Sequence, residues 1–472
     1  MNPVLSPSLA FVILIIFGLI WVGFGYWLGR RNKSLSDYML AGRNVGLALA
    51  TATAMATWVT SNTTMTAPQL TYQLGVWGMV GYSLGAVGLI LFSPLATRIK
   101  SLLPQGYTSG DFIRLRYGKL AWRIFLVISF CYAFGWLVSL GMAGGILVNA
   151  LSGIDYRIGM SVILIVCVGY TLLGGLRAVI ATDFIQTLII VAGVAAVAWL
   201  VIDNVGIESL HSSVIERRPM LLNLLFPASI MFLFNNLLFG VGEIFHSNVW
   251  WSRAFAFGEG IGGKAYLIAG FMWLPIPIVA GFIALAAPAL GLTVPAADMV
   301  GPLVAGEIMG ATGGILVFVV IFSALASSLD SLLAATADLL TQDIYRGHIN
   351  PSATDAQCQI AGKWVILGLG AFTWLLCFPR ITTLASLLYF TGAFVASAIW
   401  PIVFGLYFRR TSALGASLGM IAGSCLGLLA YFTIGFYVAA LVSCAVSLLT
   451  IVTVSALRNE DFDFQLLENS RH

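Results

Sequence analysis

Residues 48–70 read ALATATAMATWVTSNTTMTAPQL, and this stretch decides the fold. It is long enough to cross a membrane as a helix, yet nine of its residues are Ser, Thr or Asn. Such a segment belongs inside a helix bundle rather than against lipid. Hydroxyl groups can satisfy carbonyls that a helix break leaves free, and Thr tolerates extended backbone, so we predict an interruption within residues 55–60. The alternative is a continuous helix whose Thr hydroxyls bond back to their own carbonyls.

The chain around this stretch has the composition of a membrane protein. Of its 472 residues, 60% are hydrophobic and 9% are charged, whereas a soluble domain carries about 25% charged residues. Apolar runs of about 20 residues, the length that crosses a bilayer, recur along the sequence. We predict an all-α polytopic membrane protein with about thirteen spans, near 10–29, 45–70, 76–97, 122–149, 159–173, 182–202, 222–245, 265–290, 312–340, 362–378, 382–408, 413–433 and 436–456.

Several classes of function are disfavoured. The six cysteines have no CxxC or CxxH spacing, so neither a disulfide framework nor a cysteine metal site is indicated. The sequence has no GKS/T or HExxH motif, and we do not expect an enzyme. A net charge of +4 is too small to indicate a nucleic-acid partner.

The distribution of positive charge indicates an orientation. Of the 23 Lys and Arg residues, 19 fall in loops on one side of the thirteen spans, and the other four are Arg157, Arg217, Arg218 and Arg380. Positive residues gather on the cytoplasmic side of membrane proteins. We therefore predict a multi-pass protein of the cell (inner) membrane, surrounded by lipid, with its N-terminus outside and its C-terminus in the cytoplasm.

A second interruption is predicted in residues 224–245, LLFPASIMFLFNNLLFGVGEIF, because Pro and Gly loosen a helix at mid-depth. The two candidate broken spans lie five apart, as in an inverted repeat. The resulting organisation is a single transporter domain divided into an extra helix and loop at 1–44, a first repeat at 45–202, a second repeat at 203–410, two C-terminal helices at 411–456 and a cytoplasmic tail at 457–472.

A stripe of small residues runs along the ninth span, in FSALASSLDSLLAATADLLTQDIY (residues 322–345). At helical periodicity Ala324, Ser327, Ser328 and Ser331 share one face. Such a stripe serves close helix packing or supplies oxygen ligands. Asp330 lies beside it, and a carboxylate inside a span is costly unless it meets a cation, a proton or water.

The string YTLLGGLRAVIATDFIQT (residues 170–187) resembles the signature of the sodium:solute symporter family, which carries a GG, a small residue, then TD and Q. The residues that match are Gly174, Gly175, Ala178, Thr182, Asp183 and Gln186. The Thr-rich segment (residues 48–70) comes before this string and the Ser-rich segment (residues 322–345) after it, which is the order found in the family. WWSRAFAF and the stretch after it (residues 250–290) look most similar to the urea and polyamine active-transporter branch, which implies a small polar solute.

The resemblance implies a LeuT-like fold of five plus five helices in inverted repeat, with broken helices, and a sodium site. By motif alignment that site would use two carbonyls and three small or hydroxyl residues, namely Ala56, Val59, Ala324, Ser327 and Ser328. A second cation or proton site would fall on Asp183, Ser327, Asp330 and Ser331. The alternatives are that Asp183 caps its helix and that Asp330 pairs with a basic loop residue.

The solute pocket is predicted from polar and aromatic residues within spans. No Arg or Lys is expected at mid-membrane, which favours a polar neutral solute over an organic anion. For each aromatic residue, packing is the alternative role. The candidates are Thr60, Asn62, Gln69, Tyr82, Trp136, Asn235, Asn236 and Tyr389. Glu243 lies near the cytoplasmic end of the seventh span, with His246 and Arg253 just beyond it. These residues could form a gating pair or a plain interfacial salt bridge, and we favour the salt bridge.

These observations predict a secondary active symporter. It would couple inward movement of sodium, or of a proton, to uptake of a small polar solute of urea-like or polyamine-like kind by alternating access. A passive channel or facilitator would need no cation site, and a transporter-like membrane sensor is the other alternative. The sequence leaves the oligomeric state open.

Overall fold

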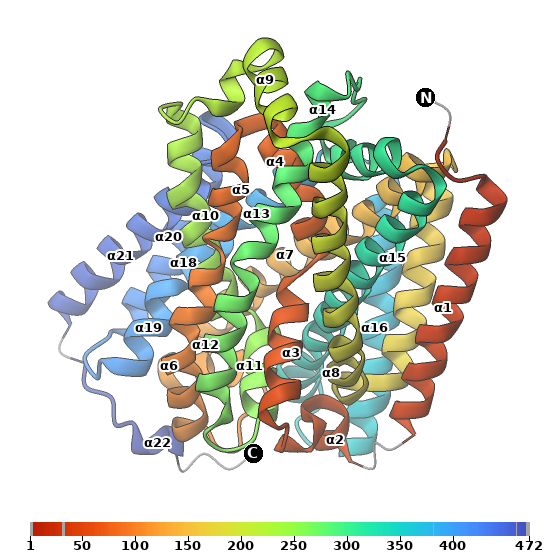
Figure 1. Cartoon of the computed structure of the whole chain (residues 1–472). Helices are drawn as coiled ribbons and strands as arrows, with labels where there is room; N and C mark the ends of the chain where they lie inside the picture. Colours follow the sequence, from red (N-terminus) through yellow and green to blue (C-terminus); the bar gives the residue numbers. More distant parts are fainter. Residues whose placement is uncertain (1–2, 31–33, 381, 459, 469–472) are drawn as a thin grey trace.

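The computed structural model describes residues 3–30, 34–380, 382–458 and 460–468 and is all-helical, with no β-strand in these ranges (Figure 1). The helices of the first half of the chain are α1 (Pro7–Gly29), α2 (Leu35–Leu40), α3 (Leu47–Trp58), α4 (Ala67–Leu74), α5 (Val76–Ser83), α6 (Ala86–Leu102), α7 (Ser109–Ser152), α8 (Tyr156–Val205) and α9 (Ile207–Arg217). A π-helical turn (Asn62–Thr66) leads into α4.

The second half continues in the same way. Its helices are α10 (Pro227–His246), α11 (Asn248–Ala256), α12 (Ile261–Trp273), α13 (Pro275–Phe282), α14 (Ala286–Ala289), α15 (Val300–Leu339), α16 (Asp355–Cys377), α17 (Leu384–Phe390), α18 (Gly392–Ser397), α19 (Ile399–Tyr407), α20 (Ala413–Thr433), α21 (Ala439–Leu457) and α22 (Gln465–Glu468). A π-helical segment (Leu340–Ile349) extends α15, and short 3₁₀ turns (Ala41–Arg43, Pro219–Leu222, Ile283–Leu285 and Ala297–Met299) join other helices.

Eleven helices among the described residues are long and apolar enough to cross a membrane, against the thirteen spans predicted. Two features account for the difference. The predicted fifth and sixth spans form one helix, α8, which bends at Gly175, a residue with φ +61°. The predicted second span is divided, and its first part, α3, is a shorter apolar helix. The exact count of thirteen therefore remains a prediction.

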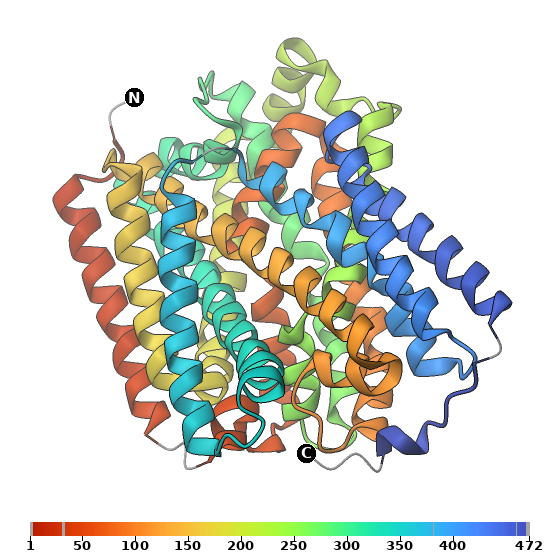
Figure 2. The same cartoon turned by 180° about the vertical axis from the view of Figure 1, so that it is seen from behind.

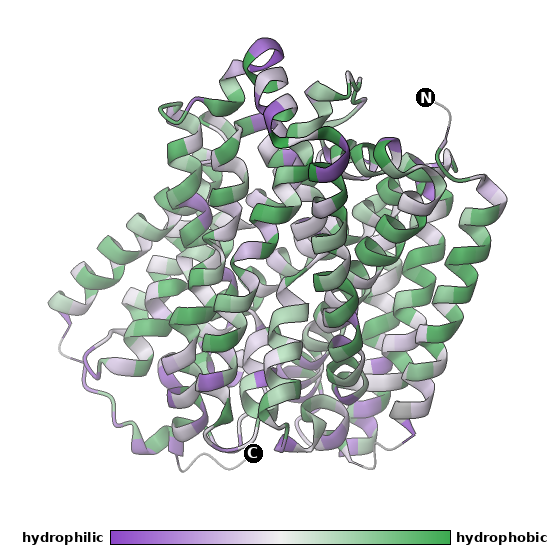
Figure 3. Ribbon diagram, viewed as in Figure 1, coloured by the Kyte–Doolittle hydropathy of each residue, from purple (hydrophilic) through white to green (hydrophobic). Residues whose placement is uncertain are grey.

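Hydrophobic residues form a band around the middle of the bundle, and hydrophilic residues gather toward its two ends (Figure 3). The first helix, α1, begins at the end opposite to the one where α22 lies (Figure 1). Seen from behind, α1 packs on α8 at one flank, while α20 and α21 pack together at the other (Figure 2). Arg31, Lys33 and Arg471, which entered the charge count, lie outside the described residues.

The predicted interruption of the second span is confirmed. Helix α3 ends at Trp58, and Val59 leaves the helical region with φ −84° and ψ 85°. Thr60 and Thr63 hold the break by reciprocal bonds, in which each backbone N–H donates to the other hydroxyl at 3.1 Å. The Thr63 hydroxyl also donates to the Trp58 carbonyl at 3.1 Å. The continuous-helix alternative is wrong, because these hydroxyls replace main-chain bonds across the gap.

The prediction of a break at mid-depth in residues 224–245 is wrong. Helix α10 is continuous to His246, and the chain is interrupted at Ser247, before α11. Pro227 lies in the first turn, where a missing N–H costs nothing. The two glycines serve close packing instead: a Cβ on Gly240 would lie 2.7 Å from Gly85 Cα, and one on Gly242 would lie 2.7 Å from the Val395 carbonyl oxygen.

Candidate functional site

The break in the second span frees two carbonyl groups. In a continuous helix the N–H of Thr60 would donate to Ala56, and that of Thr63 would donate to Val59. Both amides donate to Thr hydroxyls instead. Ala56 and Val59 are fully buried, so their carbonyl oxygens lie inside the protein without these two helical donors. These are the two carbonyls that the sequence resemblance assigned to a sodium ion.

The Ser-lined face of α15 lies against this break. The Ser328 hydroxyl donates to the Thr57 carbonyl at 3.2 Å, which joins α15 directly to the last turn of α3, and to the Ala324 carbonyl at 3.0 Å. Ala324, Ser327 and Ser328 are all buried. Carbonyl and hydroxyl oxygens are the ligands that a hard monovalent cation prefers. The donor set at the contact of α3 and α15 therefore fits sodium chemically.

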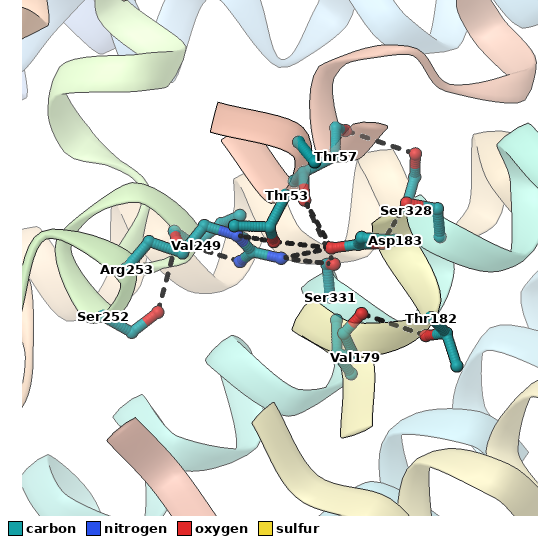
Figure 4. Close-up of polar contacts among 12 residues, drawn as sticks. Thr53, Thr57, Val179, Thr182, Asp183, Val249, Ser252, Arg253, Ser328 and Ser331 are labelled. Atoms are coloured by element: carbon teal, nitrogen blue, oxygen red, sulfur yellow. Dashed lines mark hydrogen bonds and ion pairs between the residues drawn. The ribbon is translucent and has the colours of Figure 1, made fainter. Parts of the chain in front are cut away.

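A buried ion pair lies one turn further along the same interface (Figure 4). The Arg253 guanidinium comes from α11 and the Asp183 carboxylate from α8, 3.4 Å apart, and both side chains are fully buried. Thr53 donates to Asp183 at 2.6 Å, and Ser327 donates to its other carboxylate oxygen. Arg253 also donates to Ser331 at 2.7 Å. Four helices, α3, α8, α11 and α15, thus meet at one charged cluster.

Three predictions are affected by this cluster. Asp183 does not cap a helix, because it lies inside α8 and accepts bonds from α3, α11 and α15. Arg253 is neither a loop residue nor a partner of Glu243, and the predicted salt bridge is wrong. Glu243 accepts hydrogen bonds from Tyr132 and Trp250 instead. Sequence reasoning missed Arg253 because the chain after α10 turns at Ser247 and re-enters the bundle as α11.

Asp330 does not join the other three residues of the predicted second site. It is fully buried, and neither carboxylate oxygen has a hydrogen-bond partner within the described part of the chain. It pairs with no basic residue among the described ranges, which contradicts the loop-pairing alternative.

Most of the solute candidates gather around an aromatic cluster at the break. We define this cluster as Trp58, Trp136, Phe239 and Trp273. Trp136 stacks between Trp58 and Phe239, with ring centroids 5.9 Å apart on each side. Trp273 lies 5.7 Å from Trp58. Tyr82 contacts Trp273 and reaches the hydroxyls of Thr60 and Thr63, while Tyr389 contacts Phe239 and donates to Asn236 at 2.8 Å.

Three amide candidates have different surroundings. Asn235 is not part of this cluster, because its side chain bonds the backbone of residues 436, 440 and 441 and ties α10 to α21. Gln69 accepts from the Ala385 N–H at 3.3 Å, at the start of α17. Asn62 accepts from Ser139 of α7 at 2.9 Å, directly beyond the break.

Several buried donors near the break have no acceptor among the described residues. They are the indole N–H groups of Trp58 and Trp273 and the amide nitrogen of Asn62. Each of these residues is at most 5% exposed. A buried donor without a partner costs about 1–3 kcal/mol, so such groups are rare unless an acceptor binds there. Each of these groups could therefore donate a hydrogen bond to an acceptor that binds beside the break.

The protein has an interrupted helix with freed carbonyls, and a Ser-lined helix packs against it at the centre of a hydrophobic bundle. These features place it in the class of multi-pass membrane proteins with broken helices. The chain belongs to the sodium:solute symporter family, whose model matches residues 38–423. That range contains both helices of the predicted sodium site.

The comparisons give relatives with named solutes. The chain is 28% identical to a urea-proton symporter, DUR3, of Oryza sativa over 92% of the chain, and 25% identical to a urea active transporter of Saccharomyces cerevisiae over 91%. It spans 66% and 64% of the lengths of these two relatives. It is also 27% identical to the high-affinity proline transporter PutP of Bacillus subtilis, over 85% of the chain and 87% of that protein. All three are transporters rather than enzymes.

A solved structure has the same fold. The substrate-bound, outward-open Na⁺-coupled sialic acid symporter superimposes with a TM-score of 0.81, at 18% identity, over 96% of this chain and 98% of that one. This likeness confirms the LeuT-like fold predicted from the sequence.

Proposed function

We propose that this protein is a secondary active symporter that couples inward movement of sodium to uptake of a small, planar, neutral solute of the urea type. The observation that carries the proposal is the break that frees the Ala56 and Val59 carbonyls from their helical donors, next to the point where the Ser328 hydroxyl of α15 bonds the Thr57 carbonyl. Family membership and the named solutes of the relatives support it. A channel would have no need of this donor set.

The coupling mechanism follows from where the ion would bind. Sodium would bind between α3 and α15, with the carbonyls of Ala56 and Val59 and the Ala324, Ser327 and Ser328 positions as its ligands. A bound cation would hold the break of α3 in place and so fix Trp58, which is the last residue of α3 and part of the aromatic cluster. The ion thereby favours solute binding. One charge moving down 100 mV supplies about 2.3 kcal/mol, enough for a roughly forty-fold concentration ratio.

We propose a single coupling sodium. The other acidic position at this interface, Asp183, already has a positive partner in Arg253, and Ser331 accepts a hydrogen bond from the same guanidinium. A second cation there would compete with a charge fixed to the chain. Asp330, the remaining residue of the predicted second site, has no hydrogen-bond partner within the described part of the chain.

The orientation and the repeat boundaries remain part of the proposal. The positive charge in the loops supports an outside N-terminus and a cytoplasmic C-terminus in the cell (inner) membrane, and the opposite ends at which α1 begins and α22 lies agree with an odd number of spans (Figure 1). The repeats would span 45–202 and 203–410, with α3 and the α10–α11 pair as their corresponding interrupted elements.

Uptake of radiolabelled urea into proteoliposomes tests this function. We expect accumulation above the outside concentration when an inward sodium gradient and an inside-negative potential are imposed. Equilibration without accumulation would favour a facilitator instead. Uptake that responds neither to sodium nor to pH would refute ion coupling, and proline in place of urea tests the other solute that the relatives suggest.

A further inference from the structure

Glu243 is a buried carboxylate with an unusual set of partners. Its residue is 2% exposed and lies in the last turn of α10. The Tyr132 hydroxyl of α7 donates to one carboxylate oxygen, and the Trp250 indole of α11 donates to both, at 3.0 and 3.2 Å. Both donors are neutral. The group therefore has hydrogen bonds but no compensating positive charge.

The positively charged side chains on the surrounding helices bind groups other than Glu243. Arg253 of α11 binds Asp183, and Lys100 of α6 donates to the carbonyls of residues 255 and 257. The titratable groups that face Glu243 are Tyr132, Tyr82 of α5 and His246 of its own helix. None of these carries a positive charge unless His246 takes up a proton. An ionised carboxylate without a cation is costly in a membrane interior, whereas a protonated one is neutral.

A small cavity lies on the far side of Tyr132. Its lining comes from α7, α10, α11 and α15 and mixes apolar residues with polar ones, among them Ser129, His246, Ser247 and Thr336. The Ser129 hydroxyl and both His246 ring nitrogens are buried and have no partner in the part of the chain that the structure describes. The cavity has room for about one water molecule. Unpartnered donors and acceptors around such a space suit the passage of a proton.

Tyr132 connects the carboxylate to this cavity. Its hydroxyl donates to Glu243, and Tyr132 and Ser247 both line the cavity. If Glu243 gains a proton on the oxygen that faces Tyr132, the Tyr132 hydroxyl can turn and donate to Ser247 instead. The Tyr132 hydroxyl passes its proton to Glu243 and takes another from a hydronium ion in the cavity, so one O–H bond breaks and one forms at Tyr132, an O–H bond forms at Glu243, and a water molecule is left in the cavity.

The two donors of Glu243 also connect to the aromatic cluster at the break of α3. Trp250 packs edge-on against Trp58 with ring centroids 5.6 Å apart, and Tyr132 lies 5.7 Å from Trp136. Protonation of Glu243 changes which hydrogen bonds Trp250 and Tyr132 can make with its carboxyl group. A change in their orientation would therefore reach the two rings that stack beside the proposed solute site.

We propose that Glu243 is a proton-binding site, which exchanges its proton through Tyr132 and the adjacent cavity and so makes the aromatic cluster sensitive to pH. The site itself is defined by the contacts of Glu243, while its link to transport rests on the proposed function. The chemistry it adds is proton coupling, in addition to the sodium held between α3 and α15.

Infrared difference spectroscopy on the purified full-length protein in lipid vesicles tests the site without any solute. Spectra recorded in acidic and alkaline buffer should contain a carboxylic-acid band that Glu243→Gln removes. Glu307→Gln is the matched control, because Glu307 is exposed on α15, and it should leave that band in place. A spectrum of Glu243→Gln that keeps every pH-dependent acid band of the wild type would overturn the proposal.

Tyr132→Phe provides a second infrared test of the proposal if Glu243→Gln does not fold. This variant keeps the carboxyl group and removes its hydroxyl donor, so the acid band should remain and move in frequency. An unmoved band would contradict the relay. In proteoliposomes, urea uptake by the wild type should respond to an inward proton gradient, and that response should be lost in Glu243→Gln. Wild-type vesicles that take up no urea under any gradient would refute the proposed function, and the infrared result would still decide whether Glu243 binds a proton.

Discussion

The buried pair of Arg253 and Asp183 gives the sharpest prediction about stability. Arg253 donates to the Thr53 hydroxyl at 3.0 Å, the Val249 carbonyl at 3.2 Å, Ser331 at 2.7 Å and Asp183 at 3.4 Å, and both charged side chains are fully buried. Removing one member of such a pair leaves an uncompensated buried charge, which costs about 3–5 kcal/mol. We expect this loss for Arg253→Met and for Asp183→Asn.

Because the two residues share one interaction, the double variant should lose less stability than the sum of the single losses, by about 1–3 kcal/mol. Unfolding in mixed micelles titrated with sodium dodecyl sulfate, followed by tryptophan fluorescence, measures the four free energies of unfolding. The control is the exposed pair of Arg346 and Asp355, 3.5 Å apart, for which about 0–1 kcal/mol of coupling is expected.

Arg253→Met should also change the response to sodium. It leaves the Asp183 carboxylate beside Ser327 and Ser331 without its positive partner, so sodium should stabilise the variant more than the wild type. Saturation to 100 times a Kd adds about 2.7 kcal/mol for each site. Strictly additive single losses, together with an unchanged sodium response, would refute the reasoning that Arg253 supplies the charge at this position.

Three further predictions concern packing and the solute site. Gly242→Ala should lower stability by about 1–3 kcal/mol, because its Cβ would meet the backbone of residue 395 at 2.7 Å, whereas Gly368→Ala, with nothing within 4 Å, should be neutral or stabilising in the same unfolding titration. Trp136→Leu removes two stacked contacts and should raise the KM for urea by about tenfold, since each aromatic pair contributes about 0.5–1.5 kcal/mol; an unchanged KM would move the solute site elsewhere. Asn235→Leu should destabilise the protein by about 1–3 kcal/mol through its lost bonds to α21 and leave the KM unaltered, and a raised KM with normal stability would contradict this.

The central interruption was predictable because its cause is local. Thr60 and Thr63 are close enough in sequence to bond each other, so a Thr-rich segment within an apolar chain carries the signal. The face shared by Ser327 and Ser328 follows from helical periodicity in the same way. The identity of their partner helix came from the family resemblance, since no sequence pattern in the chain specifies which helices touch.

The features that sequence reasoning missed depend on tertiary contacts. Gly240 and Gly242 look like helix-loosening residues, but their lack of a side chain is used for contact with α18 and the start of α6. Arg253 looks like a cytoplasmic loop residue because it follows an apolar span. One local signal could have corrected this reading: Ser247 can cap a new helix, and the Trp residues before Arg253 make that helix apolar.

Binding of radioactive sodium to the purified protein tests the central claim most directly. The account predicts saturable binding to the wild type and a Kd raised about tenfold or more in Ser328→Ala, equivalent to about 1.4 kcal/mol or more for one lost oxygen ligand. Ser323→Ala, five residues earlier on α15 with a buried hydroxyl that has no partner among the described residues, should bind as the wild type does. Equal sodium binding by Ser328→Ala and the wild type would contradict an ion held between α3 and α15.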